Sequence, residues 1–242
     1  NEKRPDENYI NELPLPARYL LNNALYRTPD TDEPIAFILT GMGCPYRCIF
    51  CNSGNVYGYN VHSRDILSVA DEIEVCVKDF SIKNFFFRSE TFTFDKEWTI
   101  SLCKKILDRK LKIRWGTNSR VDTIDEERLF WMKSSGCSVI GFGAETASRE
   151  GLKGIGKNIT PGQIKNAVSA CKRFDIESFL IFIIGFPWDT EKIIKDTIDF
   201  AIAANSSFIE VNIAFPFPGT SLYNLVKERG LLASDRLIGY DY

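Results

Sequence analysis

The run Ile35-Ala-Phe-Ile-Leu-Thr-Gly-Met-Gly-Cys-Pro-Tyr-Arg-Cys-Ile-Phe-Cys51 decides how the rest of the chain is interpreted. It joins a short apolar stretch, residues 35–39, to three cysteines, Cys44, Cys48 and Cys51, in the spacing C-x3-C-x2-C. Clustered thiolates are soft ligands suited to an iron–sulfur cluster or to zinc. A four-iron cubane held by three cysteines keeps one iron open to a small molecule.

Zinc is the alternative metal for this cysteine cluster. A structural zinc site takes four protein ligands. The chain has one histidine, His62, and no second C-x2-C pair to complete such a set. The ligand count therefore favours the iron–sulfur cluster.

Length and composition exclude several classes of protein. The 242 residues are 44% hydrophobic and 26% charged with a net charge of −2, which fits one large globular domain or two small ones and gives no nucleic-acid signal. No apolar run is long enough to span a membrane. Seven cysteines, an odd number with three bunched together, favour a reducing compartment, so we expect a cytoplasmic protein. The small basic runs, Lys153 to Lys157 and Lys172-Arg173, are interpreted as solvated surface.

Short apolar runs alternate with longer helical patterns along the chain. The expected strands are 35–40, 84–88, 112–117, 138–142, 177–184 and 208–214. The expected helices are 63–80, 96–109, 125–135, 161–173, 190–205 and 221–229. Six strand–helix units in a row require a parallel sheet, closed as a whole or partial (β/α) barrel or left as an open doubly wound sheet. No G-x-G-x-x-G or phosphate-binding lysine loop occurs, which favours the barrel.

The two ends of the chain suggest a piece of a longer protein. Residues 1–34 are polar and rich in proline, and we interpret them as a linker with one short helical stretch near 17–25. Residues 35–242 are interpreted as the α/β barrel domain. The chain starts without methionine and stops abruptly at Asp241-Tyr242, so we expect further sequence beyond it.

These features closely resemble the radical S-adenosylmethionine (radical SAM) enzymes. That family carries C-x3-C-x2-C on the loop after the first strand of a partial (β/α)6 barrel, commonly with an aromatic residue before the third cysteine, as Phe50 is here. The resemblance implies a [4Fe-4S] cluster bound by Cys44, Cys48 and Cys51, S-adenosylmethionine at the open iron, and Phe50 beside the cofactor.

The resemblance extends over residues 35–230 and assigns three further residues to the cofactor. Glu90, in the run 87–94, matches the acidic residue that holds the methionine amino group. Arg120 belongs to a run similar to the family's W-x4-R-x-D segment, and Glu145 ends a run similar to its G-x-E segment. Each follows an expected strand, so all three should gather at one mouth of the barrel.

The reaction implied by the resemblance is reductive cleavage of S-adenosylmethionine to a 5′-deoxyadenosyl radical. An external donor such as flavodoxin or ferredoxin would reduce the cluster, and the radical would abstract hydrogen from a substrate that the sequence does not identify. The protein would supply orientation and exclusion of water.

One branch of the superfamily matches best. Residues 10–18 resemble the connector that follows a cobalamin-binding domain, which favours a cobalamin-dependent methyltransferase. No D-x-H-x-x-G motif occurs, so cobalamin would be held by a domain that this chain lacks. A methylthiotransferase is an alternative, although it would carry three further cysteines upstream and none precede Cys44. A non-catalytic iron–sulfur electron carrier is another alternative, although such carriers close the cluster with a fourth cysteine.

The remaining cysteines and the histidine are set aside as structural. Cys76, Cys103 and Cys171 lie in the apolar stripes of expected helices and Cys137 precedes a strand, so we expect all four in the core. For His62 we expect a structural or surface role.

Overall fold

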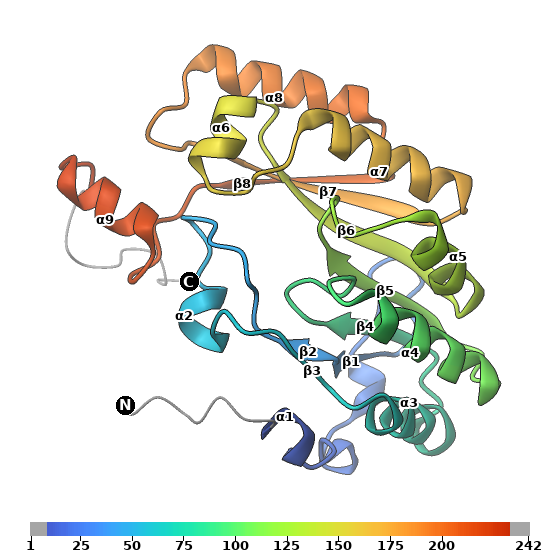
Figure 1. Ribbon diagram of the computed structural model, residues 1–242. Coiled ribbons are helices and arrows are strands. Elements are labelled where there is room, and N and C mark those ends of the chain that lie inside the picture. Colours follow the sequence, from blue (N-terminus) through green and yellow to red (C-terminus); the bar gives the residue numbers. More distant parts are fainter. Residues whose placement is uncertain (1–8, 233–242) are drawn as a thin grey trace.

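The computed structural model describes residues 9–232, and within them the six expected strands form one parallel sheet (Figure 1). The strand order is the order along the chain, β1-β4-β5-β6-β7-β8, as successive right-handed strand–helix units require. The strands are β1 (Ile35–Leu39), β4 (Asn84–Arg88), β5 (Arg114–Ser119), β6 (Cys137–Glu145), β7 (Glu177–Ile184) and β8 (Phe208–Ile213). The first and last strands form the edges of the sheet, so the predicted partial barrel is confirmed and is open on one side.

The parallel register brings the carboxyl ends of the strands to one edge of the sheet. The first residues of β1, β4 and β5 pair in a row, because Ile35 lies opposite Asn84 and Asn84 lies opposite Arg114. The loops that follow the strands therefore emerge together, which is where the sequence places its cysteines and acids.

Five helices cover the outer face of the sheet (Figure 1). They are α3 (Ile66–Phe80), α4 (Lys96–Asp108), α5 (Glu126–Ser134), α7 (Pro161–Arg173) and α8 (Glu191–Ala204). Their starts follow the capping chemistry of the sequence. Thr160 and Gln163 form a reciprocal capping box at the start of α7, and Asp125 Oδ1 accepts a hydrogen bond from the Arg128 backbone N–H at 2.8 Å.

Several element boundaries differ from the sequence prediction. The helix expected from residue 63 begins at Ile66, because Asp65 caps it and β3 (His62–Ser63) pairs with β2 (Gly41–Met42) in a small antiparallel ribbon. Strand β5 starts two residues late and β6 runs three residues further than expected. Two helices of five and six residues, α2 (Ser53–Tyr57) and α6 (Arg149–Gly154), are too short to show a periodicity. The last described helix is α9 (Ser221–Glu228).

The core lies between the sheet and the outer helices. Its largest fully buried side chains include Trp115, Phe87, Phe142 and Phe182. Along each strand, such residues alternate with residues that face the barrel interior. The four cysteines expected in the core, Cys76, Cys103, Cys137 and Cys171, are all buried, so that prediction is confirmed.

No helix within residues 9–232 has the length and apolar character needed to cross a bilayer.

The described part of the linker packs onto the sheet through specific polar contacts. It contains α1 (Tyr9–Glu12) and two 3-10 turns, Arg18–Leu20 and Asn23–Leu25, in place of the single helical stretch expected near 17–25. Its Arg18 Nη2 donates to the Phe37 carbonyl oxygen and to Glu72 Oε1, both at 2.8 Å. The domain boundary at residue 34 stays a prediction, and residues 1–8 and 233–242 of the two proposed segments lie outside the described residues.

Candidate functional site

The three clustered cysteines line one cavity at the carboxyl edge of the sheet. Its volume is about 140 Å³, and Cys44, Cys48 and Cys51 all contribute to its wall. The loop is fixed from two sides at its centre, since the Ile49 N–H donates to the Ile155 carbonyl at 3.0 Å and the Ile49 carbonyl accepts from the Leu222 N–H at 2.9 Å. The segments after β6 and β8, at the end of α6 and the start of α9, therefore hold the loop that follows β1.

Gly156 is required for that support. Its φ is +72°, and a Cβ there would lie 2.9 Å from the Arg47 carbonyl oxygen and 3.8 Å from the Cys48 Cα. Only glycine combines the left-handed backbone with so close an approach to the cysteine loop. The backbone at Gly156 thus packs directly against the cysteine loop at Arg47 and Cys48.

Cationic groups lie near the thiols. Burial raises the pKa of Cys48, and the charges of Lys157 and Arg120 oppose that rise. Burial also raises the pKa of Cys44, with Arg120 again among the opposing groups. Positive charge next to thiols favours the thiolate, the form that binds metals.

As the side chains stand, residues 9–232 hold no set of three His, Cys, Asp or Glu groups arranged around a single metal ion. Each iron of a multi-iron cluster takes its own cysteine, so three thiols around one cavity suit a cluster.

Glu90 presents an unsatisfied carboxylate oxygen next to the cysteine loop. Its Oε2 is buried and has no hydrogen-bond partner among the described residues. Burial raises the pKa of Glu90, while the backbone N–H groups of Glu90 and Gly43 and the charge of Arg88 act against it. Buried carboxylate oxygens normally have partners. An orphan at this position fits a bound group that donates hydrogen bonds, such as an ammonium.

Arg120 is buried and held by three residues. Its Nε and Nη2 donate to the two carboxylate oxygens of Asp122, each at 2.9 Å, and Nη2 also donates to the Lys157 carbonyl at 2.8 Å. Its guanidinium lies over the ring of Tyr46, 3.6 Å from the centroid. Since Tyr46 lies between the first two cysteines, Arg120 ties the cysteine loop to the loops after β5 and β6.

Glu145 forms a buried ion pair with Lys157. The Lys157 Nζ lies 2.6 Å from Glu145 Oε1, and the two side chains are only 8% and 6% exposed. The backbone of Glu145 has φ +62°, an unusual conformation for a residue other than glycine, at the end of a strand whose register shifts between Gly143 and Glu145. The pair places an acid and a base beside the cysteine cavity.

Residues 38–201 of the chain match the Radical SAM superfamily. The chain belongs to this superfamily. The sequence resemblance is thereby confirmed, and with it the assignment to a superfamily of enzymes.

Relatives and solved structures agree with that family. An uncharacterized methyltransferase of Pyrococcus horikoshii is 34% identical over 95% of this chain and 50% of its own length. The anaerobic magnesium-protoporphyrin IX monomethyl ester cyclase of Rubrivivax gelatinosus is 30% identical over 75% of this chain and 33% of its own. The radical S-adenosylmethionine methyltransferase TsrM from Kitasatospora setae, solved with cobalamin and a [4Fe-4S] cluster, superposes with a TM-score of 0.75 at 21% identity, covering 82% of this chain and 37% of TsrM. The chain thus spans half or less of these proteins, and TsrM supports the fold alone.

Phe50 is the expected cofactor residue whose side chain packs against the hydrophobic core. Its ring meets Phe186 edge-on at a centroid distance of 6.0 Å and packs against the core. A role for Phe50 beside the cofactor stays a prediction.

Lys157 lies beside the cysteine cavity, and the sequence analysis missed it. The basic run from Lys153 to Lys157 is interpreted above as solvated surface, which is wrong for Lys157 because its side chain is only 8% exposed. Its partner lies twelve positions earlier in the sequence, across α6. Composition alone cannot distinguish a buried lysine from a surface one, and the short α6 gave no periodicity to place it.

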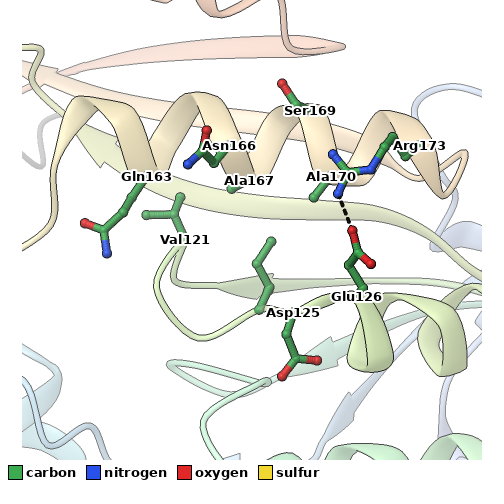
Figure 2. A pocket seen from close by; sticks show the side chains of 10 residues that line it. Val121, Asp125, Glu126, Gln163, Asn166, Ala167, Ser169, Ala170 and Arg173 are labelled. Carbon is green, nitrogen blue, oxygen red and sulfur yellow. Dashed lines mark hydrogen bonds and ion pairs between the residues drawn. The ribbon is translucent and has the colours of Figure 1, made fainter.

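A second cavity lies on the outside of the radical SAM barrel, between α5 and α7, with a volume of about 340 Å³. Figure 2 shows it with the ion pair of Arg173 and Glu126 at one end, where Arg173 Nη2 lies 2.7 Å from Glu126 Oε1. None of the expected site residues lines it. Its charged groups are already paired or capping, so we assign it no part in the site.

Proposed function

We propose that the chain is the catalytic barrel of a radical SAM methyltransferase, in which Cys44, Cys48 and Cys51 hold a [4Fe-4S] cluster and S-adenosylmethionine binds beside it. One observation carries this proposal. The three thiols of a single loop line one cavity at the carboxyl edge of a parallel sheet, with cationic side chains beside them. That edge is where barrels of this kind assemble their active sites.

The residues around the cavity suit the polar groups of S-adenosylmethionine. When bound, the cluster supplies the electron for reductive cleavage, and the protein groups bind and orient. Glu90 Oε2 would accept hydrogen bonds from the methionine ammonium, which satisfies its orphaned oxygen. Glu145 and Lys157 would offer an acceptor and a donor to the remaining polar groups of the cofactor.

Arg120 acts in this proposal as a positioning residue. Both of its bonded nitrogens are used by Asp122 and Lys157, and its flat face is used by Tyr46. It would therefore hold the cysteine loop and the ion pair in their relative places, and its charge would stabilise the thiolates.

Methyl transfer and cobalamin are the finer parts of the proposal. They are supported by the Pyrococcus methyltransferase at 34% identity and by the fold shared with the cobalamin-bound TsrM. Cobalamin would be held by another domain of a longer protein, and an external donor such as flavodoxin or ferredoxin would reduce the cluster.

The test is iron and sulfide analysis after anaerobic reconstitution of the full chain. We expect about four irons and four sulfides per chain and their loss in Cys44→Ala, Cys48→Ala and Cys51→Ala. Cys76→Ala, which removes a buried cysteine from the core, is the matched control and should keep the cluster. Stoichiometric zinc in protein purified without oxygen, or a full cluster in Cys48→Ala, would overturn the proposal.

A further inference from the structure

A cavity of about 520 Å³ lies inside the barrel at the end opposite the cysteine loop. Its wall includes the first residues of five strands, Ile35, Asn84, Arg114, Glu177 and Phe208. We refer to this cavity as the amino-end chamber. Branched side chains fill the interior of a closed eight-stranded barrel, whereas this six-stranded sheet is open on one side and keeps a chamber here. Its size falls within the range of about 300–1,000 Å³ typical of small-molecule sites.

The walls of the amino-end chamber are mainly aromatic and aliphatic. Phe86, Phe179 and Phe208 contribute rings, and the Phe179 and Phe208 rings meet at right angles with centroids 6.5 Å apart. Gly116 has no side chain to fill the space between its neighbours. A Cβ there would collide with Val139 Cγ1 and lie 3.5 Å from the Phe86 ring. Flat faces of this kind suit an aromatic or other planar apolar body.

Carboxylates outnumber cations around the amino-end chamber. Asp30, Glu177 and Glu210 line it together with one cation, Arg114, which gives the lining a net charge of −2. Arg114 Nη1 lies 3.0 Å from Asp30 Oδ2, while its Nη2 lies 3.9 Å from Glu177 Oε2. Glu210 Oε1 accepts a hydrogen bond from Asn212 Nδ2 at 2.6 Å. The guanidinium lies closer to Asp30 than to Glu177, and a single cation leaves the three carboxylates with an excess of negative charge.

We propose that the amino-end chamber is a second binding site, for an amine that carries a planar apolar body. The rings would take the apolar body, and Glu177 and Glu210 would attract the ammonium, helped by the faces of the phenylalanine rings. The chamber shares no lining residue with the cysteine cavity. Binding there needs neither cluster nor S-adenosylmethionine, so this inference goes beyond the proposed function and can fail or succeed without it.

The test compares three probes with one ring system and different charge. Calorimetric titrations of the full, reconstituted chain would use 2-naphthylmethylamine, the neutral 2-naphthylmethanol and the anionic 2-naphthoate. We expect the amine to bind at least about tenfold more tightly than the carboxylate. Glu177→Gln/Glu210→Gln, which preserves volume, should reduce that ratio to about threefold or less. Glu126→Gln removes a carboxylate from the outer face and is the matched control that should leave the ratio unchanged.

Val139→Trp completes the test by occupying the chamber from within, and it should abolish binding of all three probes. Equal affinities for the amine and the carboxylate would overturn the proposal. So would a ratio that is unchanged in the double glutamine variant, or naphthyl binding that persists in a folded Val139→Trp protein. The double glutamine variant keeps the test decisive if Val139→Trp does not fold.

Discussion

Lys157 and Glu145 form an ion pair of 2.6 Å that is almost fully withdrawn from solvent, although they come from the two ends of the segment that contains α6. The pair lies directly over Gly143, where a Cβ would collide with both Glu145 Oε1 and Lys157 Nζ. It is linked to the rest of the site through the Lys157 carbonyl, which accepts from Arg120. The pair therefore connects the end of β6 with the groups that support the cysteine loop.

Lys157→Met should destabilise the protein strongly, because it leaves a buried carboxylate without its partner. Loss of one member of a buried ion pair costs about 3–5 kcal/mol. We expect the double variant Glu145→Gln/Lys157→Met to be clearly less destabilised than the sum of the two single variants. Chemical denaturation of all four proteins measures this coupling.

An exposed pair of the same length is the matched control for that cycle. Lys133 Nζ also lies 2.6 Å from Asp175 Oδ2, but the two side chains are 40% and 95% exposed. Lys133→Met and Asp175→Asn should be additive, since exposed pairs are screened by water. Additive effects at Lys157 and Glu145 would contradict the structural role assigned to the buried pair.

Gly143→Ala should destabilise the barrel and disturb the ion pair. The added methyl group would displace the charged ends of both side chains, and because their ion pair is buried, we expect a cost of about 1–3 kcal/mol. Gly154→Ala is the control, because a Cβ there has only Trp188 Cζ2 in its surroundings, at 3.8 Å. Thermal melts should show a lower Tm for Gly143→Ala and an unchanged or higher one for Gly154→Ala. Equal melts would show that the pair moves aside at no cost.

Thiol labelling should separate the seven cysteines into two groups. Burial raises the pKa of Cys76 to about 11 and those of Cys103 and Cys171 to about 12, and it raises the pKa of Cys137 well above its usual value. At pH 8 these groups stay protonated and shielded, because a raised pKa keeps the thiolate fraction small.

Cluster-free native protein should therefore react at no more than three thiols, with the exposed Cys51 first, and at all seven once denatured. A colorimetric thiol assay with mass spectrometric mapping measures this. Rapid labelling of any of the four core cysteines in folded protein would contradict the burial described here.

Glu72→Ala should loosen the linker as well as destabilise the fold. The buried Glu72 carboxylate pairs with Arg18 from the linker and with Arg64 ahead of α3. Its loss leaves two guanidinium groups without their acid, at a cost of about 3–5 kcal/mol. Limited proteolysis should cut near Tyr19 sooner in this variant, whereas the more exposed Glu74→Ala serves as control and should behave like the parent chain. Unchanged cleavage would show that other contacts hold the linker.

The sequence was sufficient for the order of the six sheet strands and of the longer helices, because strand and helix periodicities and capping residues are local. Asp125, Thr160 and Thr190 each cap the helix that begins at the next residue. The positions of the site residues after the strands follow from the parallel sheet. What the sequence did not reveal were the partners of charged groups that lie far apart along the chain.

Pairings that cross the fold carry no local signal. Arg120 could be placed near the mouth from its motif, but its stacking on Tyr46 and its bond to the Lys157 carbonyl depend on how three loops meet. The burial of Lys157 likewise depends on the short helix α6 turning it back toward Glu145. The amino-end chamber was also not predicted, because it depends on side-chain sizes contributed by all six strands.

Electron paramagnetic resonance of the reduced, reconstituted chain, recorded with and without S-adenosylmethionine, tests the central claim most directly. We expect the signal of one [4Fe-4S] cluster per chain to shift when S-adenosylmethionine binds. Glu90→Gln should keep the cluster but require about tenfold or more S-adenosylmethionine for the shift, since a charged hydrogen bond is lost. A cluster signal that S-adenosylmethionine leaves unchanged at saturating concentration would contradict the account.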